Sequence, residues 1–227
     1  MLVVAHRGAG ALFPENSLTA FRNVAATGAD GAECDVHLSA DGHLMVMHDR
    51  SLKRTTGVDG EVGDFTRMQL ARLDVGDGQG VPTLEEVLEA TPVALRVEMK
   101  EPDTLDALVD FVDAHPEWRE RIVVTSFHHG PLLALRQRRP DVATVPLLAG
   151  YPVHPGRVAQ DAGSDTLGLQ FAGVTEAYVD LCHREGVKLT VWTPNEEADI
   201  RRMIALGVDG ITSDRPDRVV KLLGRGS

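Results

Sequence analysis

Short apolar runs rich in β-branched residues alternate with amphipathic stretches along the whole chain. The apolar runs predict strands at residues 2–5, 31–36, 94–99, 122–126, 143–147, 166–169, 188–192 and 209–212. A helical pattern follows each strand, such as residues 18–26 after the first and 103–114 after the third. In the latter, the apolar positions at 105, 108, 109 and 112 share one helix face. This alternation is typical of a parallel sheet covered by helices.

Eight strand–helix pairs within 227 residues predict a closed (β/α)8 barrel, the TIM barrel, as a single α/β domain over residues 1–227. An open, doubly wound sheet is the alternative. It is less favoured because the first strand is not followed by the glycine-rich pattern GxGxxG, which binds phosphate in such sheets.

The strand–helix rhythm breaks after the second strand. Asp41-Gly42 lies between two extended runs and predicts a hairpin turn, so we expect the chain to double back and return His48 to the level of Glu33. Residues 50–80 are polar, rich in glycine and too long for a plain loop. They predict a small cap inserted over the barrel mouth.

Two helix starts carry capping signals. Thr83 is expected to be an N-cap, with Glu86 completing a capping box. Asn16 is a candidate N-cap for the first helix, and Glu15 before it either enters that helix or reaches the barrel mouth.

Charge and composition narrow the classes of partner. The chain has 23 basic and 34 acidic residues, a formal net charge of −11, so we expect no nucleic-acid partner and no diffuse attraction to anionic membranes. No stretch is long enough to span a membrane, so no stable insertion is expected. Two cysteines, Cys34 and Cys182, are too few for a disulfide framework and are expected to be buried thiols.

The first residues lack the apolar core of a signal peptide, which favours a cytoplasmic protein. A secreted protein whose leader has been removed shows the same features. The sequence carries no signal for the oligomeric state.

Acidic residues gather where the predicted second and third strands end. Strand periodicity places Glu33 and Asp35 on one face with Cys34 on the other, and it places Glu98 beside Lys100 on the next strand of the sequence. Catalytic groups of such barrels lie at the carboxyl ends of strands. Any one carboxylate is explained by a surface ion pair, but three on two apolar strands repel one another unless a cation neutralises them. An all-oxygen set favours Mg²⁺ or Ca²⁺ over zinc.

Other polar and aromatic residues lie at strand ends as well. His6 and His48 are the candidate pair for proton transfer, because histidine titrates near working pH. Arg7 and Lys100 supply positive charge for a phosphate, although Arg7 would also serve to balance the acidic trio. Trp192 either walls the pocket or packs in the core.

The remaining strand ends are less informative. His128-His129 follows the fourth predicted strand at the correct end of the barrel, without an identifiable partner. Asn195 and Asp214 follow the last two strands and receive no assigned role. The other histidines are expected at the surface or in satisfied positions: His37, His43, His115, His154 and His183.

Eight segments between Ala5 and Asp217 together resemble the glycerophosphodiester phosphodiesterase family. They are, in the order typical of that family, AHRG with PENSLTAF, GAECDVHLSADGHLMVMHD, SLKRTTGVDGEV, VPTLEEVL, RVEMK, VTSF, TVWTPN and GVDGITSDRPD. A lone HRG would be weak, whereas the ordered set is highly specific and covers nearly the whole chain.

The resemblance implies a TIM barrel with a small insertion after the second strand. It also implies one divalent cation, Mg²⁺ or Ca²⁺ with Mn²⁺ as a further candidate. The implied roles agree with those drawn from the strand ends. Metal ligands are Glu33, Asp35 and Glu98; the acid–base pair is His6 and His48; phosphate contacts are Arg7 and Lys100.

The implied reaction is hydrolysis of small glycerophosphodiesters, such as glycerophosphocholine and glycerophosphoethanolamine, to sn-glycerol 3-phosphate and an alcohol. Family members often carry Asn or Asp at the position of His128, and the insertion is compact here. Both differences leave the head-group preference open.

Three other functions are weighed. A lysophospholipase D or a related phospholipase would be expected to show an apolar lid or a basic rim, whereas the insertion is polar and the chain acidic. An amidohydrolase would be expected to carry two histidines separated by one residue after the first strand, but Arg7-Gly8 follows His6. A non-catalytic barrel that binds glycerophosphodiesters would be expected to have lost an acidic ligand or a histidine, and all five are retained.

Overall fold

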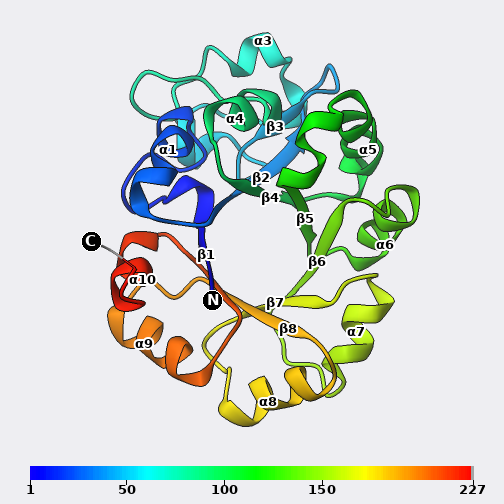
Figure 1. Cartoon of the computed structure of the whole chain (residues 1–227). Helices are drawn as coiled ribbons and strands as arrows, with labels where there is room; N and C mark the ends of the chain where they lie inside the picture. Colours follow the sequence, from blue (N-terminus) through cyan, green and yellow to red (C-terminus); the bar gives the residue numbers. More distant parts are fainter. Residues whose placement is uncertain (226–227) are drawn as a thin grey trace.

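A closed ring of parallel strands forms the centre of the molecule (Figure 1), in a computed structural model that describes residues 1–225. Its strands are β1 (Leu2–Ala5), β2 (Gly31–Leu38), β4 (Ala94–Met99), β5 (Ile122–Ser126), β6 (Ala143–Leu148), β7 (Thr166–Gln170), β8 (Lys188–Trp192) and β9 (Gly210–Ser213). Strands that are consecutive in this list pair with each other, and β1 closes the ring by pairing with both β2 and β9. The predicted (β/α)8 barrel is confirmed.

Helices surround the ring and cover its outer surface (Figure 1). They are α1 (Leu18–Asn23), α4 (Leu84–Ala90), α5 (Leu105–Ala114), α6 (His129–Arg138), α7 (Pro155–Asp161), α8 (Glu176–Arg184), α9 (Glu197–Leu206) and α10 (Pro216–Leu222). Short 3-10 turns lie at His6–Gly8, Val24–Thr27, Val62–Asp64, Pro102–Thr104 and Pro116–Arg121. Amphipathic helices pack in this way because one apolar face is removed from water against the strands.

The two capping predictions have different outcomes. Thr83 caps α4 as predicted: its Oγ1 accepts a hydrogen bond from Glu86 N, and its own N–H donates to Glu86 Oε2. The Asn16 prediction is wrong. Ser17 caps α1, with its Oγ accepting from Ala20 N, while Asn16 adopts a left-handed φ of 55° and its side chain points into the barrel mouth.

The predicted hairpin after β2 is present. Strand β3 (Leu44–Val46) runs antiparallel to β2, and Gly42 in the turn has a φ of 81°, a conformation that favours glycine. Beyond β3, Met47 N donates to Asp35 O at 3.0 Å, so the returning chain stays beside β2 as far as the acidic residues. His48 therefore reaches the barrel mouth.

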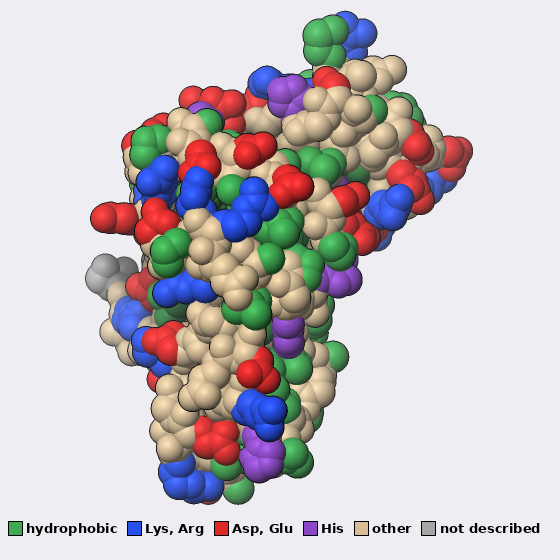
Figure 2. Space-filling view, turned by 90° about the vertical axis from the view of Figure 1, so that its right-hand side faces the viewer, with side chains coloured by type: hydrophobic (Ala, Val, Ile, Leu, Met, Phe, Trp, Pro, Cys, Tyr) green, Lys and Arg blue, Asp and Glu red, His purple; other side chains and the backbone are tan. Residues whose placement is uncertain are grey.

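Residues 50–80 contain α2 (Lys53–Thr56), the 3-10 turn Val62–Asp64 and α3 (Arg67–Leu70). Apolar side chains of this segment, of the β3 region and of the residue that follows the segment form a small core separate from that of the barrel: Met45, Met47, Leu52, Val62, Leu70, Val75 and Val81. Figure 1 places α3 at the top edge, and Figure 2 shows the top of the molecule projecting sideways beyond the parts below it. The insertion thus has its own packing.

Both cysteines are buried free thiols, as predicted. Cys34 points outward from β2 into the layer of apolar residues between strands and helices, on the opposite face from its acidic neighbours. Among the helices of residues 1–225, none combines the length and apolar character needed to cross a bilayer.

Candidate active site

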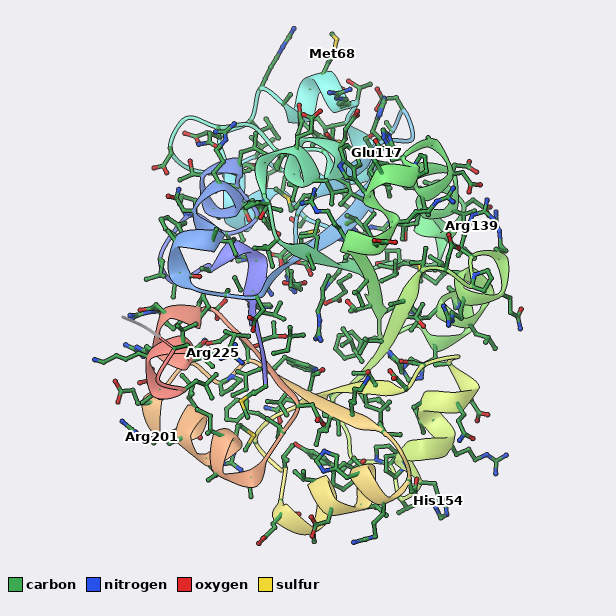
Figure 3. The ribbon with its side chains drawn as sticks, viewed as in Figure 1. Met68, Glu117, Arg139, His154, Arg201 and Arg225 are labelled. Carbon is green, nitrogen blue, oxygen red and sulfur yellow. The ribbon has the colours of Figure 1, made fainter. Side chains whose placement is uncertain are left out.

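The carboxyl ends of the strands open into a cavity of about 250 Å³. Seven side chains that the sequence singles out line it: His6, Arg7, Glu33, His48, Glu98, Lys100 and Trp192. Asp35 lies directly beside them on β2. Figure 3 shows side chains filling the centre of the ring, whereas His154 points outward at the lower edge.

Three carboxylates converge at this end of the barrel. One oxygen each of Glu33, Asp35 and Glu98 lies within 4.8 Å of the other two, and Asp35 is the register neighbour of Glu98. Within residues 1–225, the buried Glu33 Oε1 has no hydrogen-bond partner. An all-oxygen set with an unpaired buried oxygen fits a hard divalent cation such as Mg²⁺ or Ca²⁺.

The surroundings of these carboxylates shift their pKa values in different directions. Burial and the nearby Asp35 raise the pKa of Glu33 to about 8, and burial likewise raises the pKa of Glu98. Burial also acts to raise the pKa of Asp35, but Lys100, His48 and Arg7 outweigh it, so this pKa is lowered. Without a cation, burial and mutual repulsion therefore favour a proton within this group of carboxylates at neutral pH.

Two basic side chains border the trio. Lys100 Nζ lies 2.8 Å from Glu98 Oε1 and 3.3 Å from Asp35 Oδ1. Arg7 Nε lies 3.6 Å from Asp35 Oδ2, and Arg7 Nη1 donates to Glu15 Oε1 at 3.2 Å. Glu15 was expected either to enter the first helix or to reach the barrel mouth. The structure shows that it reaches the mouth.

The tight turn at residues 6–8 positions Arg7. Its backbone N–H donates to Glu33 Oε2 at 2.9 Å, and its φ is 50°. Gly8 follows with a φ of 77°, and a Cβ there would lie 2.7 Å from Ala20 Cβ. Only glycine fits this close approach to α1, which explains the HRG sequence in physical terms.

His6 is held by residues at the ends of the last two strands. Its Nδ1 donates to Asp214 Oδ1 at 2.7 Å, and Asp214 Oδ2 accepts from Asn195 Nδ2 at 2.7 Å. Asn195 Oδ1 in turn accepts from Asp214 N at 2.9 Å. Burial acts to lower the pKa of His6, but the hydrogen bond to Asp214 and the charge of Glu33 outweigh it and raise this pKa.

His48 has an equivalent arrangement. Its Nδ1 donates to Asp49 Oδ1 at 2.6 Å, and Asp49 Oδ2 accepts from Arg54 Nε at 2.5 Å. Burial lowers the pKa of His48. Because a carboxylate holds Nδ1 of each ring, Nε2 of both His6 and His48 is left to accept or donate a proton at the cavity.

Aromatic side chains form one wall. Trp192 lies edge-on to Phe127, with ring centroids 5.6 Å apart, and both line the cavity. Of the histidine pair after β5, His129 Nε2 contacts Leu147 O at 3.0 Å, and His128 is exposed; neither lines the cavity.

Sequence reasoning missed several residues that hold the site together. Asn16 donates to Asp35 Oδ2 at 3.0 Å, and Asp49, Asn195 and Asp214 orient the two histidines. Their positions at strand ends were a usable signal for Asn195 and Asp214. Arg96, on the inward face of β4, also lines the cavity and was not singled out.

Comparison with protein families gives a match to the model of the "Glycerophosphoryl diester phosphodiesterase family" over residues 6–218. A glycerophosphodiester phosphodiesterase of Caldanaerobacter subterraneus subsp. tengcongensis is 34% identical to this chain over 99% of its length and 98% of the relative. One from Bacillus altitudinis is 33% identical over 97% of each chain.

Solved structures with the same fold include a phosphodiesterase of Oleispira antarctica in complex with the product sn-glycerol-3-phosphate. Its TM-score is 0.92 at 25% identity, with 99% of this chain and 97% of the other covered. The glycerophosphodiester phosphodiesterase of Thermotoga maritima superposes with a TM-score of 0.84 at 28% identity, covering 98% of both chains.

Proposed function

Because the chain belongs to the glycerophosphoryl diester phosphodiesterase family, we propose that it hydrolyses small glycerophosphodiesters to sn-glycerol 3-phosphate and an alcohol. Glycerophosphocholine and glycerophosphoethanolamine are the first substrates to test. The observation that carries the proposal is the meeting, in and directly beside one cavity, of three carboxylates, two basic side chains and two histidines, each histidine held at Nδ1 by an aspartate.

The chain's own residues divide the chemistry. Arg7 and Lys100 bind the phosphate oxygens, Arg7 through its planar fork and Lys100 as a point charge. Of His6 and His48, one removes a proton from the attacking oxygen and the other donates a proton to the leaving alkoxide. The same set serves attack by water and attack by the glycerol 2-hydroxyl through a cyclic phosphate.

Glu33, Asp35 and Glu98 are the residues proposed to hold one divalent cation. Bound there, it supplies positive charge to the phosphate and lowers the pKa of an oxygen nucleophile. Lys100 holds two of these carboxylates, and Asn16 holds Asp35 from the other side. The donor set is therefore ordered before a cation binds.

A coupled assay for released glycerol 3-phosphate tests the reaction. It is run on glycerophosphodiesters with several head groups, each with Mg²⁺, Ca²⁺ or Mn²⁺. We expect release that depends on the added cation. Absence of release from all of them, together with measurable binding of the diesters, would instead identify a non-catalytic binding barrel.

Exposed apolar residues favour a second substrate class, lysophospholipids. Phe127 is 45% exposed and Val153 is 78% exposed, and they follow β5 and β6 at the same end of the barrel as the cavity. A single acyl chain would bury such surface. An assay for the released head-group alcohol, run on a lysophospholipid and a glycerophosphodiester with the same head group, decides between the two classes. A turnover of the lysophospholipid comparable with that of the glycerophosphodiester supports lysophospholipase D activity, and its absence removes it.

A further inference from the structure

Arg96 lines the cavity on β4, the strand that also carries Glu98. It precedes Glu98 by two residues on the same face of β4, which places it about 7 Å deeper along the strand. Its register neighbour on β2 is Glu33. Thr125, Leu147, Gly168, Thr190 and Thr212 also line the cavity.

The guanidinium of Arg96 has few protein partners. Within residues 1–225 it makes one hydrogen bond, from Nη1 to Thr190 Oγ1 at 3.4 Å, and no ion pair. A guanidinium carries five N–H donors, and buried charges ordinarily have full sets of partners. An arginine side chain keeps its positive charge at neutral pH. Unused donors of a fixed positive charge therefore face the cavity.

Glu33 is the carboxylate nearest along the register, but its oxygens have other uses. Its Oε2 accepts from Arg7 N, and its Oε1, which is buried without a hydrogen-bond partner within residues 1–225, is available to the proposed cation site. Glu33 is the charged group that acts on Arg96, and a cation held at the proposed site would compete for that charge. The further lining residues are neutral: Thr125, Leu147, Gly168, Thr190 and Thr212.

The absence of a side chain at Gly168 keeps space in the cavity. A Cβ on Gly168 would lie 2.5 Å from Leu147 Cδ2, so a larger residue at this position would displace the leucine. Thr190 Oγ1 donates to Leu167 O at 3.1 Å, which fixes the acceptor that holds Arg96. The cavity therefore has space for a ligand group beside the Arg96 guanidinium, which Thr190 orients.

We propose that Arg96 determines specificity by binding an anionic group, a carboxylate or a phosphate, on the arm of the diester that enters the barrel. The proposal rests on the proposed function, because the arm extends from the phosphate group that Arg7 and Lys100 are proposed to bind. It also implies that a cationic head group is directed outward, since choline or ethanolamine beside Arg96 would be repelled.

Calorimetric titration with three ligands that share a three-carbon skeleton and one phosphate tests this proposal. The ligands are sn-glycerol 3-phosphate, 3-phosphoglycerate and glycerol 1,3-bisphosphate, titrated into the protein with Mg²⁺. A charge-assisted, bidentate contact predicts that the two ligands with a second anion bind about tenfold more tightly. Substitution Arg96→Met should remove that advantage and change the affinity for glycerol 3-phosphate by less than about threefold.

Two further variants keep the test decisive. Arg96→Lys retains the charge without the fork and should keep part of the advantage even where Arg96→Met does not fold. Arg157→Met, on the exposed outer surface at α7, should behave as wild type. Equal affinity for the three ligands in the wild-type protein overturns the proposal, as does an advantage that persists in Arg96→Met, because the second anion would then be binding the cation.

The binding measurement is independent of turnover. If the protein shows the Arg96-dependent preference but releases no glycerol 3-phosphate from any diester, the proposed reaction is refuted and the anion site is supported. If it hydrolyses diesters without this preference, the proposed reaction is supported and the anion site is refuted.

Discussion

His6 and Asp214 are 208 positions apart in the chain, and their Nδ1 and Oδ1 atoms lie 2.7 Å apart. His6 directly follows β1, and Asp214 directly follows β9, the first and last strands of the barrel. Because these two strands pair side by side, closure of the ring itself builds the contact. The carboxylate orients the imidazole so that Nε2 faces the cavity and the proton of the neutral ring stays on Nδ1.

Substitution Asp214→Asn should therefore lower kcat by about 10²-fold or more, with a small effect on KM, because His6 loses the group that fixes its tautomer. Nitrogen-15 NMR of the histidine rings provides a direct readout, since His6 should lose its Nδ1–H form. Asp165→Asn, at an exposed residue paired with Lys188, is the matched control and should be inert. An unchanged kcat in Asp214→Asn would contradict an orienting role.

Substitution of either His6 or His48 by alanine should lower kcat by about 10²–10⁴-fold, because each ring is proposed to move one proton. Steady-state kinetics and circular dichroism on the purified variants separate lost chemistry from lost folding. His154→Ala, at a ring that is exposed and points away from the barrel, is the control. Near-normal turnover in a folded variant would remove that histidine from the mechanism.

Treatment with EDTA should abolish activity, and adding Mg²⁺ back should restore it, because three clustered carboxylates need a cation to share the site with an anionic phosphate. The Glu98→Gln variant should require a higher Mg²⁺ concentration for half-maximal rate. Full activity after exhaustive chelation would show that the carboxylates serve another purpose.

Cation affinity should also depend on pH. Since burial and Asp35 raise the pKa of Glu33 to about 8, the cation must displace a proton at neutral pH. The binding-competent carboxylate is present above that pKa, so affinity should fall by about tenfold per pH unit below it and level off above it. Calorimetry in buffers of different ionisation enthalpy counts the released protons. The Glu33→Gln variant should bind the cation more weakly and without this proton release. If the cation affinity of the wild-type protein does not change between pH 6 and pH 8, the linkage is refuted.

The barrel and much of the candidate site followed from local patterns. Strand periodicity separates Glu33 and Asp35 from Cys34 without any knowledge of distant contacts, and a turn signal at Asp41-Gly42 foretells the return of His48. These predictions depend on only a few neighbouring residues, so they can be made from the sequence alone.

The residues that were missed depend on contacts that local patterns do not contain. Asn16 has the composition of a helix cap, yet the adjacent Ser17 caps α1 and leaves Asn16 to bind Asp35 across the barrel mouth. The partner of His6 is set by ring closure over the full chain. For Arg96, the inward direction follows from strand periodicity, but its lack of partners depends on which residues face it from β7 and β8.

Arg54 links the insertion at residues 50–80 to both sides of the cavity. Its Nη2 donates to Glu15 Oε1 at 2.7 Å, and its Nε donates to Asp49 Oδ2, which holds His48. Because the side chain is 49% exposed, Arg54→Ala should cost less than about 1 kcal/mol of folding free energy. Its kcat should nevertheless fall severalfold as His48 loses its support. Arg50→Ala, which breaks an exposed pair with Glu61 inside the insertion, is the control. Equal kinetics for both variants would mean that the insertion does not position His48.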